Sequence, residues 1–362
     1  MDSVICKWIE KNLRRLRDCT ELSQAQSLAN VHKVKAANAK SFVVDFFKVL
    51  EDNRVNQKLI RYIRDSTSCF GPRRLGSNIL INRFNDNSKS FFHTVESLLG
   101  EEILPKLDIT KEKQERLEKE AKNYLQKFEE VIKYNQTSAK ELNSAMISGF
   151  DLATCSGPLM DEPMQGAIFI IEDVSLAEEV REAVPNQAAV VNSHGPFGGQ
   201  VMGTLRALCK KAFLNSDPRI VEGMYLCSMQ ASPETYGVVY NVIHRFRGRV
   251  IHEEIQNGTN FFLVDALIPI LEGFEFNDHI LKMSCGVAQP QLVFHGYEVN
   301  ANNDPLFLPR TAEELADHGT GDILVDNIAK KIIEKVRKQK GLIITQKILL
   351  DGGKQRTLTK MR

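Results

Sequence analysis

The sequence predicts a mixed α+β protein with more than one domain. Its 362 residues exceed the usual size of a single domain. Hydrophobic residues make up 43% and charged residues 26%, a globular composition that excludes disordered, collagen-like and disulfide-scaffold proteins. Two patterns set the fold class: apolar residues at helical spacing near the N-terminus, and alternating strand and helix signals after residue 217.

Residues 1–66 are predicted to be helical. Apolar side chains recur there every three to four positions, within the stretches 4–16, 42–50 and 55–63. The segment 69–78 holds two glycines and one proline, which break the helical pattern. The apolar run Ile79-Leu80-Ile81 follows this break and is a predicted strand.

The stretch 84–135 is predicted to be an insertion. Within it, 111–133 carries opposite charges at helical spacing, which is typical of a solvated helix with little functional meaning. Beyond the insertion we expect a helix over 138–154, a strand over 166–174 and a helix through 201–213.

Asp217-Pro218 marks a predicted domain boundary, after which the pattern becomes regular. Ser232 is a good helix N-cap, and Asn257-Gly258 between two apolar runs signals a hairpin. Strands are expected at 223–230, 249–254, 261–270 and 291–299, with helices at 232–246 and 274–285. The resulting order, β-α-β-β-α-β, is the split-βαβ or ferredoxin-like plan. A further helix is expected near 322–339.

Charge is balanced overall but not locally. The net charge is +1, whereas residues 330–362 contain eleven Lys/Arg and two Asp/Glu, for a local net charge of +9. Such a basic segment favours nucleic-acid phosphates through counterion release. A solvated basic helix would look the same, so charge alone leaves both interpretations open.

Catalytic motifs are not found in the sequence. His194 lies in the glycine-rich stretch 193–200 at a predicted helix start, where N–H groups can bind an anion. That stretch matches neither phosphate-loop pattern, so a tight turn explains its glycines equally well. Asp161 and Glu162 are adjacent on an extended segment and should point to opposite faces. We therefore expect a non-catalytic chain without a bound cofactor or metal.

Several other classes of protein are disfavoured by the sequence. The strand Arg247-Gly-Arg-Val-Ile-His252 lacks the stacking aromatics of RNA-recognition folds. The seven cysteines are an odd number, and none of them form a C-x-x-C pair. We therefore expect reduced thiols, as in a cytosolic or nuclear protein. The N-terminus does not read as a secretory or mitochondrial signal, and no apolar run reaches the length of a membrane span, so no membrane association is expected.

Several segments of the chain carry motifs of a known family. Phe70-Gly-Pro…Gly-Ser-Asn-Ile-Leu and the segment 148–166, with its G-F-x-x-A-T pattern, resemble the strand entry and the signature of domain four in elongation factor 2. Tyr236-Gly-Val-Val, Arg247-Gly-Arg-Val and Phe274-Glu-Phe resemble motifs of domain five. The resemblance covers most of 68–83, 138–174 and 195–300. It implies a ribosomal-S5-like domain four followed by a ferredoxin-like domain five.

Within that superfamily, the chain is most similar to the elongation-factor-2-like GTPases of late large-subunit assembly. Gly195-Pro-Phe-Gly-Gly-Gln and Pro290-Gln-Leu-Val-Phe resemble motifs of this family, as do Arg337-Lys-Gln-Lys-Gly-Leu and Lys354-Gln-Arg-Thr-Leu-Thr-Lys. The resemblance implies binding to the 60S subunit and its rRNA. It also implies cooperation with the Shwachman–Diamond syndrome protein in the GTP-dependent release of initiation factor 6, in the cytoplasm.

The resemblance is confined to the carboxyl-terminal part of those GTPases. No P-loop and no N-K-x-D guanine motif occur in the sequence, so GTP and Mg are implied only for the full-length family. The implied domains are a helical extension at 1–66, an S5-like domain four at 67–216 with the insertion 84–135, a ferredoxin-like domain five at 217–305 and a basic tail at 306–362. Three explanations for the missing GTPase part remain open: a fragment, a split gene or a truncated gene model.

The resemblance also implies two sets of ribosome-contacting residues. The first is a tip, formed by Arg73, Arg74, His194, Gly195, Phe197, Gly198, Gly199 and Gln200. We expect Phe197 to be exposed there, the Arg73–Arg74 turn to lie beside the loop, and the loop to protrude away from domain five. His194 precedes Gln200 by six residues rather than the five of the diphthamide motif, so we do not transfer that modification.

The second set contacts rRNA from the tail, whose helix is expected to pack on domain four. It comprises Lys330, Lys331, Lys335, Arg337, Lys338, Lys340, Lys354, Arg356 and Lys360.

Two rival functions stay open at this point. One is elongation factor 2 itself, which the altered tip disfavours. The other is a small-molecule kinase of the S5-like fold, which would need a serine-rich glycine loop and metal-binding carboxylates that the sequence lacks.

Overall fold

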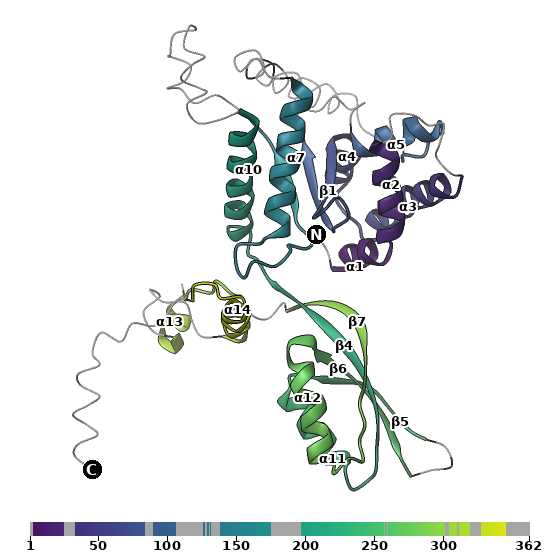
Figure 1. The fold of residues 1–362 in the computed structure, drawn as a ribbon, viewed down its shortest axis with the longest axis vertical. Helices are drawn as coiled ribbons and strands as arrows, with labels where there is room; N and C mark the ends of the chain where they lie inside the picture. The colour runs from purple at the N-terminus through teal and green to yellow at the C-terminus, as the bar shows by residue number, and fades with distance from the viewer. Residues whose placement is uncertain are drawn as a thin grey trace, which may run out of the picture.

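Helices and two small sheets make up the structure, a computed structural model that describes most of the chain. The described residues are 3–24, 33–83, 90–105, 126, 129, 131, 138–174, 197–256, 258, 260–300, 304–309, 311–318 and 327–344. Figure 1 shows two bodies, one built from residues before 215 and one from residues 220–300, with a short helix between them.

The first body begins with helices, as the apolar spacing predicts. They are α1 (Ser3–Lys11), α2 (Leu13–Gln24), α3 (Lys33–Asp52) and α4 (Gln57–Ser66). Their apolar faces meet in one core around Phe42 and Phe46, both fully buried. These helices pack against the first sheet and share a core with it, since Phe70 from that sheet lies in the same cluster.

Part of the predicted insertion 84–135 belongs to the core of the first body. Residues 91–99 form helix α5 (Phe91–Leu99), which begins at the N-cap Ser90. Phe91 and Phe92 are buried in the same core, where the Phe92 ring lies 5.6 Å from the ring of Phe46. This part is therefore structural, because its apolar residues complete the aromatic core. The charged stretch 111–133 lies outside the described residues except for 126, 129 and 131.

The first sheet has the strand order β1-β2-β3 among the described residues: β1 (Thr67–Gly71), β2 (Asn78–Asn82) and β3 (Ile168–Ile171). β1 and β2 are antiparallel, whereas β2 and β3 are parallel and are connected through α7 (Ala139–Cys155). Ser138 and Glu141 form a reciprocal capping box at the start of α7. These elements lie where the sequence places them.

Helix α10 (Phe197–Leu214) packs along α7, and both helices begin at the end of the body away from the second body (Figure 1). Gly149 allows this close approach: a Cβ atom there would lie 2.7 Å from the Met202 carbonyl oxygen. Any larger residue would push the helices apart.

The second body has the predicted β-α-β-β-α-β order. Its elements are β4 (Ile220–Ala231), α11 (Tyr236–Arg245), β5 (Arg249–Ile255), β6 (Phe262–Pro269), α12 (Ile270–Met283) and β7 (Gln291–Asn300). The strands are antiparallel in the order β5-β6-β4-β7, and both helices cover one face of the sheet (Figure 1). This confirms the ferredoxin-like prediction. Ser232 caps a turn before α11 rather than the helix itself, which begins four residues later.

The tail contains α13 (Ala312–His318) and α14 (Ile328–Gln339). Figure 1 places α14 beside the junction of the two bodies. None of the helices in the described part is both long and apolar enough to cross a membrane. All seven cysteines are described and all are free thiols.

Candidate nucleic-acid interface

Helix α14 is held in place by its apolar face. Asn327 caps the helix by accepting a hydrogen bond from the Lys330 N–H at 2.8 Å. Ala329 and Ile332 are buried against Ile220 of β4, with Leu271 of α12 and Met160 of the first body at the edge of the same cluster. The helix therefore contacts the first body, as the resemblance implies, and it also contacts the second body.

Three of the predicted tail cations are used within the protein. Lys335 lies 3.6 Å from Glu272 of α12. Arg337 donates a hydrogen bond of 2.6 Å to the carbonyl oxygen of Leu159, in the loop after α7. Lys340 approaches the Glu162 carboxylate to 2.6 Å. These side chains attach the tail to the rest of the protein, which the sequence prediction of rRNA contacts did not foresee.

Other tail cations face outward. Lys331 and Lys338 are exposed, and neither forms an ion pair with a residue in the described part of the chain. Lys330 is half-buried at the start of the helix. Lys354, Arg356 and Lys360 lie outside the described residues. Lys331 and Lys338 are thus the tail residues best placed to meet a phosphate backbone.

A second group of cations was missed by the sequence analysis. Arg206 and Lys210, one turn apart on α10, lie close to Asp161 together with Lys340 of the tail. A hydrogen bond from Ser156 and these three cations lower the pKa of Asp161. The i, i+4 spacing of Arg206 and Lys210 was visible in the sequence, but their approach to the tail depends on the tertiary fold.

The predicted tip is only partly described. Phe197 begins α10 and lies half-buried against Leu142 and Met146 of α7. The prediction that Phe197 is exposed is therefore wrong, because its side chain packs against the apolar residues of α7. Gly198, Gly199 and Gln200 form the first turn of α10, while His194 and Gly195 lie outside the described residues. The start of α10 does face away from the second body, as predicted (Figure 1).

Arg73 and Arg74 do not join this tip. They are exposed in the turn between β1 and β2, where both have left-handed backbone conformations with φ of 54° and 60°. Their backbone lies beside the carboxyl of Asp151, near the C-terminal end of α7. Phe197 instead contacts the N-terminal half of α7. The two parts of the predicted tip thus lie toward opposite ends of one helix, since the β1–β2 turn and the start of α10 are at different ends of the body.

Asp151 of α7 lies beside the β1–β2 turn. Its Oδ1 atom is buried without a hydrogen-bond partner. Burial raises the pKa of the Asp151 carboxyl, and the Arg74 guanidinium and the two N–H groups oppose this effect.

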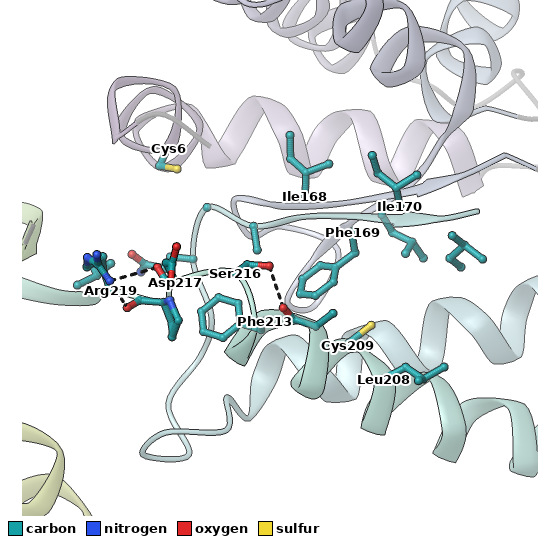
Figure 2. Close-up of a pocket in the computed structure, with 18 of the residues that line it drawn as sticks. Cys6, Ile168, Phe169, Ile170, Leu208, Cys209, Phe213, Ser216, Asp217 and Arg219 are labelled. Carbon is teal, nitrogen blue, oxygen red and sulfur yellow. Dashed lines mark hydrogen bonds between the residues drawn. The ribbon is translucent and has the colours of Figure 1, made fainter. Parts of the chain in front are cut away.

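A cavity of about 820 Å³ lies between the two bodies and is lined by β3 and α10 (Figure 2). Figure 2 shows aliphatic and aromatic side chains on its walls, among them Ile168, Phe169 and Phe213. Arg219 at one end donates to the carbonyl oxygen of Pro218 at 3.1 Å and pairs with Asp304. The described residues contain no group of three or more His, Cys, Asp or Glu side chains able to hold a metal ion. The cavity offers packing surface rather than a phosphate-binding cradle.

The chain has relatives among ribosome assembly factors. The family described as "Elongation factor G C-terminus" matches residues 219–305, the ferredoxin-like unit. Ribosome assembly protein 1 of Schizosaccharomyces pombe is 34% identical over 86% of this chain, and that of Saccharomyces cerevisiae is 32% identical over 89%. Elongation factor-like GTPase 1 of Homo sapiens is 28% identical over 97%.

The similarity is restricted to one part of each relative. The matched region spans 27%, 25% and 32% of these three proteins, respectively. The chain corresponds to their carboxyl-terminal part.

Proposed function

We propose that this chain, a homologue of the carboxyl-terminal part of the elongation-factor-like GTPases of ribosome assembly, is a ribosome-binding unit. The observation that supports this most strongly is the 34% identity to a ribosome assembly protein, sustained over 86% of the chain. The unit has no catalytic role of its own in this proposal and binds neither GTP nor Mg. Any GTP-dependent step belongs to the part of the relatives that has no counterpart in this chain.

The proposed binding partner is the 60S subunit, and the proposed contact is its rRNA. Lys331 and Lys338 on the outer side of α14 supply positive charge that is not neutralised by described residues. A cation that approaches a phosphate releases condensed counterions, so this contact would be strongly salt-dependent. The inner cations Lys335, Arg337 and Lys340 would act indirectly, by keeping α14 in its position.

The proposed cellular role follows the relatives' assignment to ribosome assembly. In it, the chain acts on cytoplasmic 60S subunits together with the Shwachman–Diamond syndrome protein and promotes release of initiation factor 6. Co-sedimentation of the purified chain with 60S subunits, with and without that protein, tests the binding part. Failure to sediment with 60S subunits at low salt would contradict the proposal, and saturable binding of GTP would contradict the absence of a nucleotide site.

A further inference from the structure

Two tyrosines on α11 share one carboxylate on the neighbouring strand. Tyr236 Oη donates a hydrogen bond of 2.7 Å to Glu253 Oε2, and Tyr240 Oη donates to the same oxygen atom. The two tyrosine rings lie 4.8 Å apart, and Tyr236 is equally close to the ring of Phe262 on β6. The result is a surface where two tyrosine hydroxyls meet one carboxylate beside a cluster of three aromatic rings.

The sheet register places this carboxylate on the helix-covered face. Glu253 pairs with Val264, whose side chain is buried beneath the helices. Ile255, two residues further along β5, pairs with Phe262 and is 59% exposed. Since side chains alternate along a strand, Glu253 and Ile255 lie on the same side as Tyr236 and Tyr240. We call this set, with Phe262, the tyrosine–glutamate patch.

The negative charge of the patch has no arginine or lysine beside it in the described structure. Three arginines occur in the segment 232–266, and all three are engaged elsewhere. Arg247 binds Glu222, Arg249 binds Glu298 and Arg245 contacts His279. Glu253 Oε1 forms no hydrogen bond within the described residues. A carboxylate oxygen next to aromatic rings is therefore available to an external cation.

The surroundings of the patch are acidic, in contrast to the basic tail. Residues 219–300 contain nine Asp/Glu and five Lys/Arg, for a local net charge of −4. The electrostatic field of a surface with net negative charge repels phosphates and attracts basic polypeptides. The hydrogen bonds from Tyr240 and Tyr236 lower the pKa of Glu253, so its carboxylate is ionised at neutral pH.

We propose that the tyrosine–glutamate patch binds an arginine side chain from a basic segment of a partner protein. A guanidinium group is planar, donates charge-assisted hydrogen bonds to carboxylate oxygens such as Glu253 Oε1, and stacks on aromatic rings, so it matches both components of the patch. The exposed Ile255 would contact the aliphatic part of the same segment. This surface is separate from α14 and uses the opposite charge, so it does not depend on the proposed rRNA contact.

Calorimetric titration of the full 362-residue chain with a nona-arginine peptide tests the proposal. Glu253→Gln should weaken binding by about tenfold, as expected for loss of one charge-assisted hydrogen bond. Glu254→Gln is the matched control. It removes the same charge from the next residue, which pairs with Leu263 and faces the other side of the sheet. We expect it to change the affinity by less than about twofold, because an exposed charge contributes little.

The rings are tested separately. Tyr240→Ala should weaken nona-arginine binding several-fold while leaving the weaker binding of nona-lysine nearly unchanged, since arginine stacks more readily than lysine. Circular dichroism melting of each variant verifies folding. Equal losses of nona-arginine affinity in Glu253→Gln and Glu254→Gln would overturn the proposal, because binding would then depend on the overall negative charge and not on the patch. A single-stranded RNA 12-mer provides the opposite outcome. If Glu253→Gln bound this RNA more tightly than the wild-type chain did, and Tyr240→Ala abolished that binding, the patch would be a surface for base stacking and the proposal would be overturned.

Discussion

Lys340 lies 2.6 Å from the carboxylate of Glu162 and connects the end of the tail helix to the loop that follows α7. The same ammonium group donates a hydrogen bond of 2.7 Å to the carbonyl oxygen of Asp161. One basic residue of the tail thus has a structural role. The position of α14 depends on such contacts at one end and on apolar packing along its length.

Replacement of Glu162 by Gln should loosen the end of α14 without unfolding the protein. Both members of the pair are partly exposed, so the expected loss is less than about 1 kcal/mol. Hydrogen exchange of the α14 amides should become faster in this variant. Glu275→Gln is the control, because Glu275 is exposed on α12 and forms no ion pair with a described residue. Unchanged exchange in Glu162→Gln would show that the ion pair does not hold the helix.

The apolar face of α14 should contribute more than its ion pairs. Ile332 is 7% exposed, and Ile332→Ala should cost about 2–5 kcal/mol through lost burial and a residual cavity. The helix would then detach, and trypsin would cleave at its lysines. Ile328→Ala on the same helix is the control, since Ile328 is 45% exposed. Equal trypsin resistance of the two variants would contradict the proposed attachment.

Acid should weaken the first body through Asp65. Burial raises the pKa of this carboxyl, but hydrogen bonds from His93 and Arg64 outweigh burial and hold it at about 2. The pKa is depressed in the folded state, so the stabilisation is complete above about pH 4 and disappears as the pH falls through about 2.

The stabilisation from Asp65 amounts to about 2 kcal/mol by linkage. Urea unfolding of the wild-type chain and of Asp65→Asn between pH 2 and 7 measures it. The difference in unfolding free energy should be largest at neutral pH and should shrink below about pH 4. A difference that stays constant over this range would exclude the carboxylate as its source.

Phe197 should behave as a structural residue. Its ring packs on Leu142 and Met146, so Phe197→Ala should destabilise the chain by about 1–3 kcal/mol, below the range for fully buried phenylalanines. Phe274 is 78% exposed, and Phe274→Ala should change stability by less than about 0.5 kcal/mol. Thermal melting compares the two. Similar melting temperatures of the two variants would contradict the packing of Phe197 and would support the exposed position that the family resemblance implies.

Local sequence signals predicted most of the fold. The helical spacing before residue 66, the apolar run Ile79–Ile81 and the β-α-β-β-α-β order all correspond to observed elements. These features depend on neighbours in the sequence, and the physical rules that link periodicity to secondary structure apply directly. The helix α5 was missed because the charged stretch after it dominated the composition of 84–135.

The candidate site was harder to predict because it depends on tertiary contacts. Arg73 and Phe197 were grouped through family resemblance, but the direction of α7 relative to the β1–β2 turn separates them. Likewise, the sequence treats Lys335 and Lys338 alike as tail cations. Only the position of Glu272 on α12 distinguishes the inner residue from the outer one.

The salt dependence of 60S binding tests the central claim most directly. Each phosphate contact to duplex-like RNA steepens the slope of log affinity against log salt by about 0.9. The double variant Lys331→Gln/Lys338→Gln should therefore reduce the slope by up to about 1.8, with α14 still protected from trypsin. Lys282→Gln, which removes an exposed cation at the end of α12, should leave the slope unchanged. An unaltered slope in the double variant would contradict the claim that the outer face of α14 contacts rRNA.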